Sequence, residues 1–115
     1  MLTLKEMSLE DIDGILEVEE ECFRTPWSKH SFEMELKNGA ARYLVAKEDG
    51  KVVGYGGTWL IIDEAHVTNI AVRESFRGKN IGSEILSKLI EICKAESWTS
   101  FEAQLFLLLG ISLQI

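Results

Sequence analysis

The residues whose types and spacing suggest chemistry form a short basic segment, Arg77-Gly78-Lys79-Asn80-Ile81-Gly82, between a strand-like and a helix-like stretch. The first amides of a helix have no intrahelical acceptor and carry a partial positive charge. Glycines before a helix lack Cβ atoms, so these amides can approach the oxygens of a ligand, while Arg77 and Lys79 add full positive charges. The segment therefore predicts a phosphate-binding site. The alternative is an ordinary turn with solvated basic residues, because glycines are common in turns.

Two common nucleotide-binding motifs are absent from this segment. It does not contain the GxxxxGK[ST] pattern of a Walker loop, nor the GxGxxG pattern of a dinucleotide-binding fold. The strands that precede it also have the pattern of an antiparallel sheet. A phosphate site at this position would therefore belong to another kind of fold.

The stretch AHVTNIAVRESFRGKNIGSEILSKLIE, residues 65–91, resembles the acetyl-CoA motif of the GNAT superfamily of N-acetyltransferases. In that motif a strand ending in I-A-V is followed by a short loop and by Q/R-x-x-G-x-G/A, which opens a helix. Arg77, Ile81 and Gly82 match this pattern. Asn80 stands where the central glycine usually lies, and Asn is among the few other residues that adopt positive φ readily. The segment FRTPWS and the order of elements are similar to the RimI-like branch, which acetylates the N-terminal alanine of ribosomal proteins.

This resemblance implies a set of residues that bind acetyl-CoA. The backbone N–H groups of a six-residue loop would hold the pyrophosphate. The strand before it would carry a bulge, and its main chain would pair with the pantetheine arm like an added strand. The loop residues are Arg77, Gly78, Lys79, Asn80, Ile81 and Gly82, and the strand residues are Ile70, Ala71 and Val72.

The implied reaction transfers acetyl from acetyl-CoA to the N-terminal α-amine of a protein, in this branch a ribosomal protein. An α-amine has a pKa of about 7.7–8.0, so it loses its proton easily near neutral pH, and a carboxylate can act as the base. A backbone N–H at the bulge would stabilise the developing oxyanion. Two alternatives remain open: a small amine or amino acid as the acceptor, and a catalytically impaired remnant that binds CoA.

By the same resemblance, the strand-like FEAQ makes Glu102 the catalytic base, with Glu64 as a second candidate. An incidental charge at a strand edge is the alternative for Glu102. The family's Asn that contacts the cofactor and its Tyr that acts as the general acid have no counterpart after residue 104. The segment 26–28, Pro-Trp-Ser, either lines the acceptor groove or packs as a turn on the core. Histidines at positions 30 and 66 are isolated, which is typical of surface or core residues.

The pattern along the chain predicts the element order β-α-α-β-β-β-α-β, an α/β (α+β) fold with a mostly antiparallel sheet flanked by helices. Ser8 and Asp11 resemble a capping box, Ser28 caps a second helix, and Asp49-Gly50 predicts a hairpin turn. Glycines at positions 54, 56 and 57 predict a bulge or the close passage of another backbone. The first helix has five residues at helical spacing, namely Ile12, Ile15, Leu16, Glu19 and Phe23.

The chain changes character near residue 97, because Glu102 is the only Asp, Glu, Lys or Arg beyond residue 96. We expect one GNAT-like domain over 1–115, in which 1–96 match the family and 97–115 form a divergent apolar tail. The tail is expected to be either a buried strand or the product of a truncated or frameshifted reading frame. The closing helix and strands of the family would then be missing.

Composition excludes several other classes. The formal net charge of −7 argues against non-specific nucleic-acid binding, which depends on Lys and Arg. Cys22 and Cys93 have no metal-ligand spacing and fit free thiols in a reducing compartment. We expect no signal peptide, because the sequence becomes acidic directly after its start, and the longest apolar run, 105–113, is too short to span a bilayer. We therefore expect a cytoplasmic protein without a metal and without a membrane partner; the oligomeric state stays open.

Overall fold

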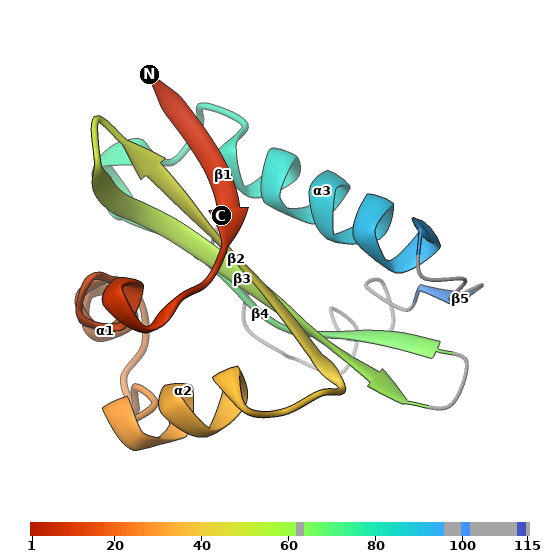
Figure 1. The fold of residues 1–115 in the computed structure, drawn as a ribbon. Coiled ribbons are helices and arrows are strands. Elements are labelled where there is room, and N and C mark those ends of the chain that lie inside the picture. The colour runs from red at the N-terminus through yellow and green to blue at the C-terminus, as the bar shows by residue number, and fades with distance from the viewer. Residues whose placement is uncertain (62–63, 96–99, 102–112, 115) are drawn as a thin grey trace.

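The structure is a computed structural model that describes residues 1–61, 64–95, 100–101 and 113–114. Up to the end of the last helix, the strands and helices follow the predicted order β-α-α-β-β-β-α (Figure 1). Two short strands are described after this helix. The elements are β1 (Leu2–Glu6), a 3-10 turn (Leu9–Asp11), α1 (Ile12–Cys22), α2 (Lys29–Leu36), β2 (Ala41–Glu48), β3 (Lys51–Ile61), β4 (Glu64–Val72), a 3-10 turn (Glu74–Phe76), α3 (Ile81–Ala95), β5 (Ser100–Phe101) and β6 (Leu113–Gln114).

Local sequence signals begin and end these elements as predicted. The N–H of Ser8 donates to Asp11 Oδ2 at 2.9 Å, which forms the capping box ahead of α1. Ser28 Oγ accepts the N–H of Ser31 at 3.1 Å and caps α2. Residues 49–50 have φ of +51° and +84°, the positive values that a two-residue hairpin between β2 and β3 requires. The hairpin turn is therefore confirmed.

The strands form one sheet in the order β1-β2-β3-β4-β5, with β6 also pairing with β4. Strands β1 to β4 pair antiparallel, whereas β5 and β6 run parallel to β4. Helices α1 and α2 cover one face of the sheet and α3 crosses the other (Figure 1). Apolar side chains fill both interfaces, with Ile15, Val18 and Phe32 buried on the α1 side and Ile85 and Leu89 buried under α3.

Glycines in β3 lie where neighbouring atoms leave no room for a side chain. A Cβ at Gly54 would lie 2.9 Å from the carbonyl oxygen of Ala71, so another backbone does pass close to this position. A Cβ at Gly56 would lie 2.6 Å from Ile85 Cγ2 in α3. At this second position the close neighbour is a packed side chain rather than a backbone. The first contact lies within the sheet, between β3 and β4, whereas the second brings α3 close to the sheet and tightens the packing of the core.

A buried ion cluster joins the start of α1 to the sheet. Asp11 is 1 % exposed, and its two oxygens lie 2.7 Å from Lys5 Nζ and 2.6 Å from Lys47 Nζ. Burial alone would raise the pKa of Asp11, but hydrogen bonds from Lys47, Lys5 and Ser8 outweigh it and hold that pKa below its usual range. The carboxylate therefore stays charged and ties β1 and β2 to the first helix.

Candidate active site

The predicted phosphate loop has the backbone conformation that its sequence suggested. Gly78 has φ of +80° and Asn80 has φ of +65°, so both adopt the left-handed region. The N–H of Glu84 donates to the Asn80 carbonyl at 3.0 Å and closes the first turn of α3. The amides of residues 81–83 come before this bond and have no acceptor within the helix. The loop thus presents main-chain N–H groups at the positive end of a 15-residue helix.

The Arg77 side chain fixes this loop to the rest of the fold. Its Nε donates to the carbonyl oxygen of Val72 at 2.9 Å, and a terminal nitrogen lies 3.2 Å from Cys22 Sγ. The backbone N–H of Arg77 donates to Glu74 at 3.2 Å. Burial raises the pKa of the Cys22 thiol, and the neighbouring guanidinium offsets only part of that rise. Arg77 therefore connects the loop to the ends of β4 and α1, and its charge remains beside the loop.

Lys79 lies on the exposed side of the same loop. Its Nζ is 5.1 Å from the ring centroid of Phe76, within the range of a cation–π contact. A Cβ built on Gly78 would meet no atom within 4 Å, so the space around this residue is open. A ligand can therefore approach the loop amides without displacing a side chain at position 78.

Strand β4 contains a bulge at its middle residue. Gly57 pairs with Asn69 and Thr58 pairs with Val67, which leaves Thr68 as an extra residue on β4. The Tyr43 hydroxyl lies 3.2 Å from Thr68 Oγ1, and Tyr43 crosses β3 at Gly57, where a Cβ would lie 2.3 Å from the ring. The structure thus has a bulge in the strand for which the resemblance implied one, and a buried aromatic residue supports it.

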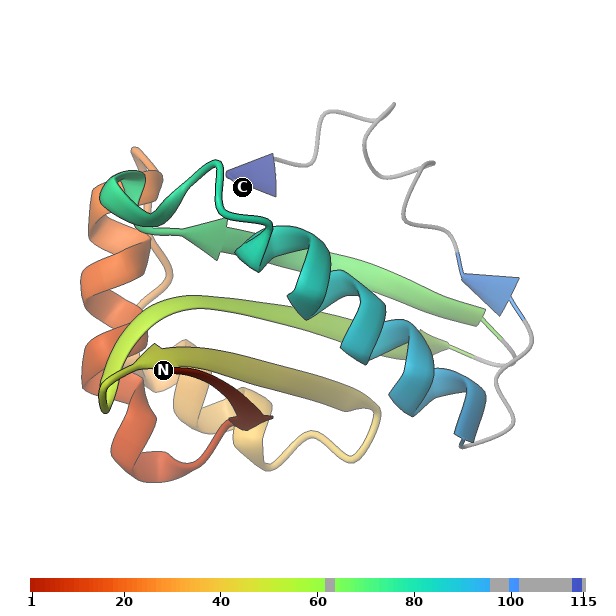
Figure 2. The same ribbon diagram turned by 90° about the horizontal axis from the view of Figure 1, so that it is seen from above.

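The far edge of β4 pairs with two short parallel strands. Glu64 and Ala65 pair with residues of β5, whereas Ile70 and Ala71 pair with Leu113 and Gln114 of β6 (Figure 2). The predicted partner of the main chain at residues 70–72 was the pantetheine arm. In this structure β6 forms the ladder at two of those three positions.

A buried carboxylate, that of Glu19 in α1, contacts β4 at Asn69, directly after the bulge. Glu19 is 1 % exposed, and its Oε2 accepts the backbone N–H of Trp27 at 2.8 Å. Its Oε1 accepts the Tyr55 hydroxyl and, at 3.3 Å, Asn69 Nδ2. Asn69 Nδ2 also donates to the Tyr55 oxygen at 2.8 Å. A cavity of about 430 Å³ opens beside this network, and its lining includes Glu19, Thr25, Trp27 and Asn69.

The sequence pattern alone assigns no functional role to Glu19, Tyr55 or Asn69. One signal was present, because Glu19 occupies a helical position whose other members are apolar. A charged residue at a core position of an amphipathic helix predicts a buried polar partner. The partners come from β3 and β4, at 36 and 50 residues along the chain, so no local pattern could identify them.

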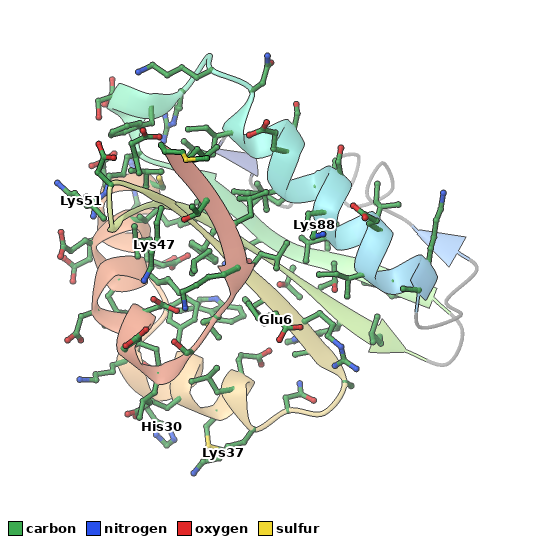
Figure 3. The ribbon with its side chains drawn as sticks, turned by 45° about the horizontal axis from the view of Figure 1, so that its top comes forward. Glu6, His30, Lys37, Lys47, Lys51 and Lys88 are labelled. Carbon is green, nitrogen blue, oxygen red and sulfur yellow. The ribbon has the colours of Figure 1, made fainter. Side chains whose placement is uncertain are left out.

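The remaining candidates are distributed as follows. Glu102 lies outside the described residues. Glu64 begins β4 and pairs with Ile61 of β3. His30 is exposed on α2 and points away from the sheet (Figure 3). His66 lies in β4 opposite Trp59. Trp27 packs against the ring of Phe32 with centroids 5.4 Å apart, so this part of the Pro-Trp-Ser segment contacts the core.

Two kinds of feature are absent from the part of the chain that the structure describes. In these residues, no group of three or more His, Cys, Asp or Glu side chains is arranged to hold a metal ion. None of the described helices combines the length and the apolar character that crossing a bilayer demands.

Comparisons with known proteins agree with this geometry. Residues 12–106 match the model of the acetyltransferase (GNAT) family. The chain is 42% identical over 92 residues to a protein of Bacillus subtilis named putative [ribosomal protein bS18]-alanine N-acetyltransferase, a match that covers 79% of this chain and 61% of that protein. The chain thus spans about three fifths of the length of this curated relative.

Solved structures show the same fold. The ribosomal-protein-S18-alanine N-acetyltransferase of Escherichia coli superposes with a TM-score of 0.79 at 22% identity, covering 88% of this chain and 64% of that one. The PaiA N-acetyltransferase of Thermoplasma acidophilum, solved in complex with coenzyme A, superposes with a TM-score of 0.78 at 18% identity, covering 85% and 75%.

Proposed function

Because this chain belongs to the acetyltransferase (GNAT) family, we propose that it transfers an acetyl group from acetyl-CoA to the N-terminal amine of a ribosomal protein. The acceptor is proposed from the name of the Bacillus subtilis relative, which specifies an alanine of ribosomal protein bS18. A ribosomal acceptor would put the reaction in the cytoplasm. The acyl donor follows from the family, whose reaction consumes acetyl-CoA.

The observation that carries this proposal is the left-handed conformation at Gly78 and Asn80 immediately before α3. These two residues let the chain turn so that successive amides face the same side, which is the arrangement that holds a diphosphate. We assign the pyrophosphate of acetyl-CoA to the backbone of residues 77–82, with the Arg77 and Lys79 charges nearby. The exposed, open surface at Gly78 is compatible with a ligand of this size.

The pantetheine arm is assigned to the edge of β4 at Ile70, Ala71 and Val72. Main-chain pairing of this kind holds an extended ligand whatever the side chains are. The same edge pairs with β6 at Ile70 and Ala71. The arm and β6 therefore exclude each other at these two residues.

The reaction needs a nucleophilic amine, a base and a donor for the oxyanion. The amine attacks the thioester carbonyl, the C–S bond breaks, and the CoA thiolate leaves. A backbone N–H near the bulge at Thr68 is suited to stabilise the negative charge on the carbonyl oxygen. Glu102 remains the proposed base, acting directly or through a water molecule.

A labelling experiment tests the proposal. The chain is incubated with radiolabelled acetyl-CoA and a peptide that carries the N-terminal sequence of a ribosomal protein with a free amine. The expected product is a peptide labelled at its terminus, and a matched peptide with a blocked terminus should stay unlabelled. Label on internal lysines alone, or only on a small amine offered in parallel, contradicts the proposed acceptor. A chain that labels none of these acceptors contradicts the proposed function.

A further inference from the structure

The network around Glu19 fixes the orientation of one side-chain amide. The Tyr55 hydroxyl has a single hydrogen, which it donates to Glu19 Oε1, so toward Asn69 its oxygen can only accept. The atom of Asn69 that lies 2.8 Å from the Tyr55 oxygen must therefore be the donor Nδ2. Nδ2 also lies 3.3 Å from the Glu19 carboxylate, an acceptor. Both contacts require the same orientation of the amide.

The other end of this amide faces away from Glu19. Because Nδ2 is turned toward Glu19 and Tyr55, Oδ1 is turned away from them, and Asn69 lines the cavity of about 430 Å³. Within the described part of the chain, the Asn69 side chain makes no hydrogen bond other than the two that Nδ2 donates. The side-chain oxygen of this half-buried, cavity-lining residue is thus held in one orientation with its hydrogen-bonding capacity unused.

The protonation of the network keeps this arrangement in place. Burial and, to a smaller extent, hydrogen bonding to Glu19 raise the pKa of Tyr55 well above its ordinary value, so the phenol keeps its hydrogen. Tyr55 is itself fully buried and packs edge-on against Phe32, with ring centroids 5.7 Å apart. Neither Tyr55 nor Glu19 can turn without disturbing the core, so the amide of Asn69 has one stable orientation.

The position of Asn69 along β4 relates it to the reaction. It directly follows the bulge residue Thr68 and directly precedes Ile70, where the pantetheine arm is assigned. An amine that attacks a thioester uses its lone pair, so only its N–H groups remain for the enzyme to hold. A fixed carbonyl oxygen beside the thioester can accept one of these N–H groups and direct the lone pair toward the carbonyl carbon.

We propose that Asn69 Oδ1 accepts a hydrogen bond from the acceptor amine in this cavity, and that Glu19 and Tyr55 are positioning residues that hold the Asn69 amide for it. The proposal rests on the proposed function, since it concerns the second substrate of that reaction. It adds a specificity rule: the acceptor must keep an N–H on its nucleophilic nitrogen as well as a free lone pair. Tertiary amines are therefore excluded as ligands of this oxygen.

Steady-state kinetics on the whole chain test this inference, with acetyl-CoA and the ribosomal peptide as substrates. Asn69→Ala removes the acceptor oxygen and should lower kcat/KM for the peptide about tenfold, the effect of one hydrogen bond of about 1.4 kcal/mol. The KM for acetyl-CoA should not change. Glu20→Gln, an exposed neighbour on α1, serves as the control and should leave both constants unchanged.

Glu19→Gln provides a second variant, in which the new side chain has nearly the same volume as the old one and therefore does not enlarge the cavity. Its amide oxygen must accept the Trp27 N–H, so its NH₂ group faces Tyr55 and Asn69. The Tyr55 hydroxyl then donates to Asn69, and the Asn69 amide turns its NH₂ to the cavity. We expect about the same tenfold loss for the peptide. The double variant with Asn69→Ala should lose no more than either single one, because the residues act as a unit.

Three results would overturn the inference. The first is a peptide kcat/KM within twofold of wild type in Asn69→Ala. The second is an equal loss for peptide and acetyl-CoA, which would indicate a purely structural role. The third is additive losses in the double variant. All three require that the wild-type chain transfers acetyl; a wild-type chain that transfers none refutes the proposed function and this inference with it.

Discussion

The conformation of Asn80 leads to a prediction that separates loop geometry from loop charge. With φ of +65°, Asn80 adopts a region that costs a residue with an ordinary side chain about 1–2 kcal/mol. Asn80→Val introduces a β-branched side chain, which is the least tolerant of this region. Either the loop keeps its shape at that cost, or it relaxes and its amides move away from the diphosphate.

We therefore expect Asn80→Val to weaken CoA binding about tenfold, since 1.4 kcal/mol corresponds to a factor of ten. Asn80→Gly is the matched control: it removes the same side chain but adopts positive φ freely, so it should bind CoA at least as tightly as wild type. Isothermal calorimetry gives both dissociation constants, and far-UV circular dichroism shows whether α3 is intact. A valine variant that is folded and binds CoA like wild type would refute the role of the loop conformation.

Three further predictions concern stability and access to β4. Gly57→Ala should lower the free energy of unfolding by about 1–3 kcal/mol, because its Cβ would lie 2.3 Å from the Tyr43 ring. The control Gly39→Ala, whose Cβ would meet no atom within 4 Å, should cost far less. Equal losses for the two variants in urea unfolding would contradict this. Asp11→Asn should cost about 3 kcal/mol at pH 7, since it leaves two lysines without their buried partner. The folded-state pKa of Asp11 is lowered, so its contribution is complete above the unfolded value of about 3.9 and is lost as the pH falls below it; a wild-type advantage that stays the same at pH 3 would be inconsistent with this. Removal of residues 113–115 should tighten CoA binding about tenfold, because it frees backbone groups whose hydrogen bonds contribute about 1 kcal/mol each, and an unchanged dissociation constant would show that β6 does not compete.

The sequence predicted those features whose causes are local. The capping box at Ser8, the hairpin turn at Asp49-Gly50 and the left-handed residue at Asn80 each depend on side chains within a few positions, and the structure confirms all three. The order of strands and helices follows from apolar periodicity, which is also local. In α3, for example, the buried residues Ile85 and Leu89 are four positions apart and share one face of the helix.

Features that depend on distant residues could not be predicted from the sequence. The exact site of the β4 bulge depends on Tyr43, which crosses Gly57 from a neighbouring strand. The role of Glu19 depends on partners in β3 and β4. The sequence of α1 alone shows only that a charged residue occupies a position on the apolar face of the helix. The pairing of β6 with Ile70 and Ala71 is likewise a contact between distant segments.

The central claim is that main-chain amides at the start of α3 hold the diphosphate of acetyl-CoA. Two-dimensional ¹H–¹⁵N spectra of the labelled chain, recorded during titration with CoA, report on each of these amides directly. The largest shifts should occur at residues 78–83, and pantetheine, which lacks the diphosphate, should not produce them. Binding of CoA that leaves these amides unshifted, or shifts them no more than pantetheine does, would contradict it.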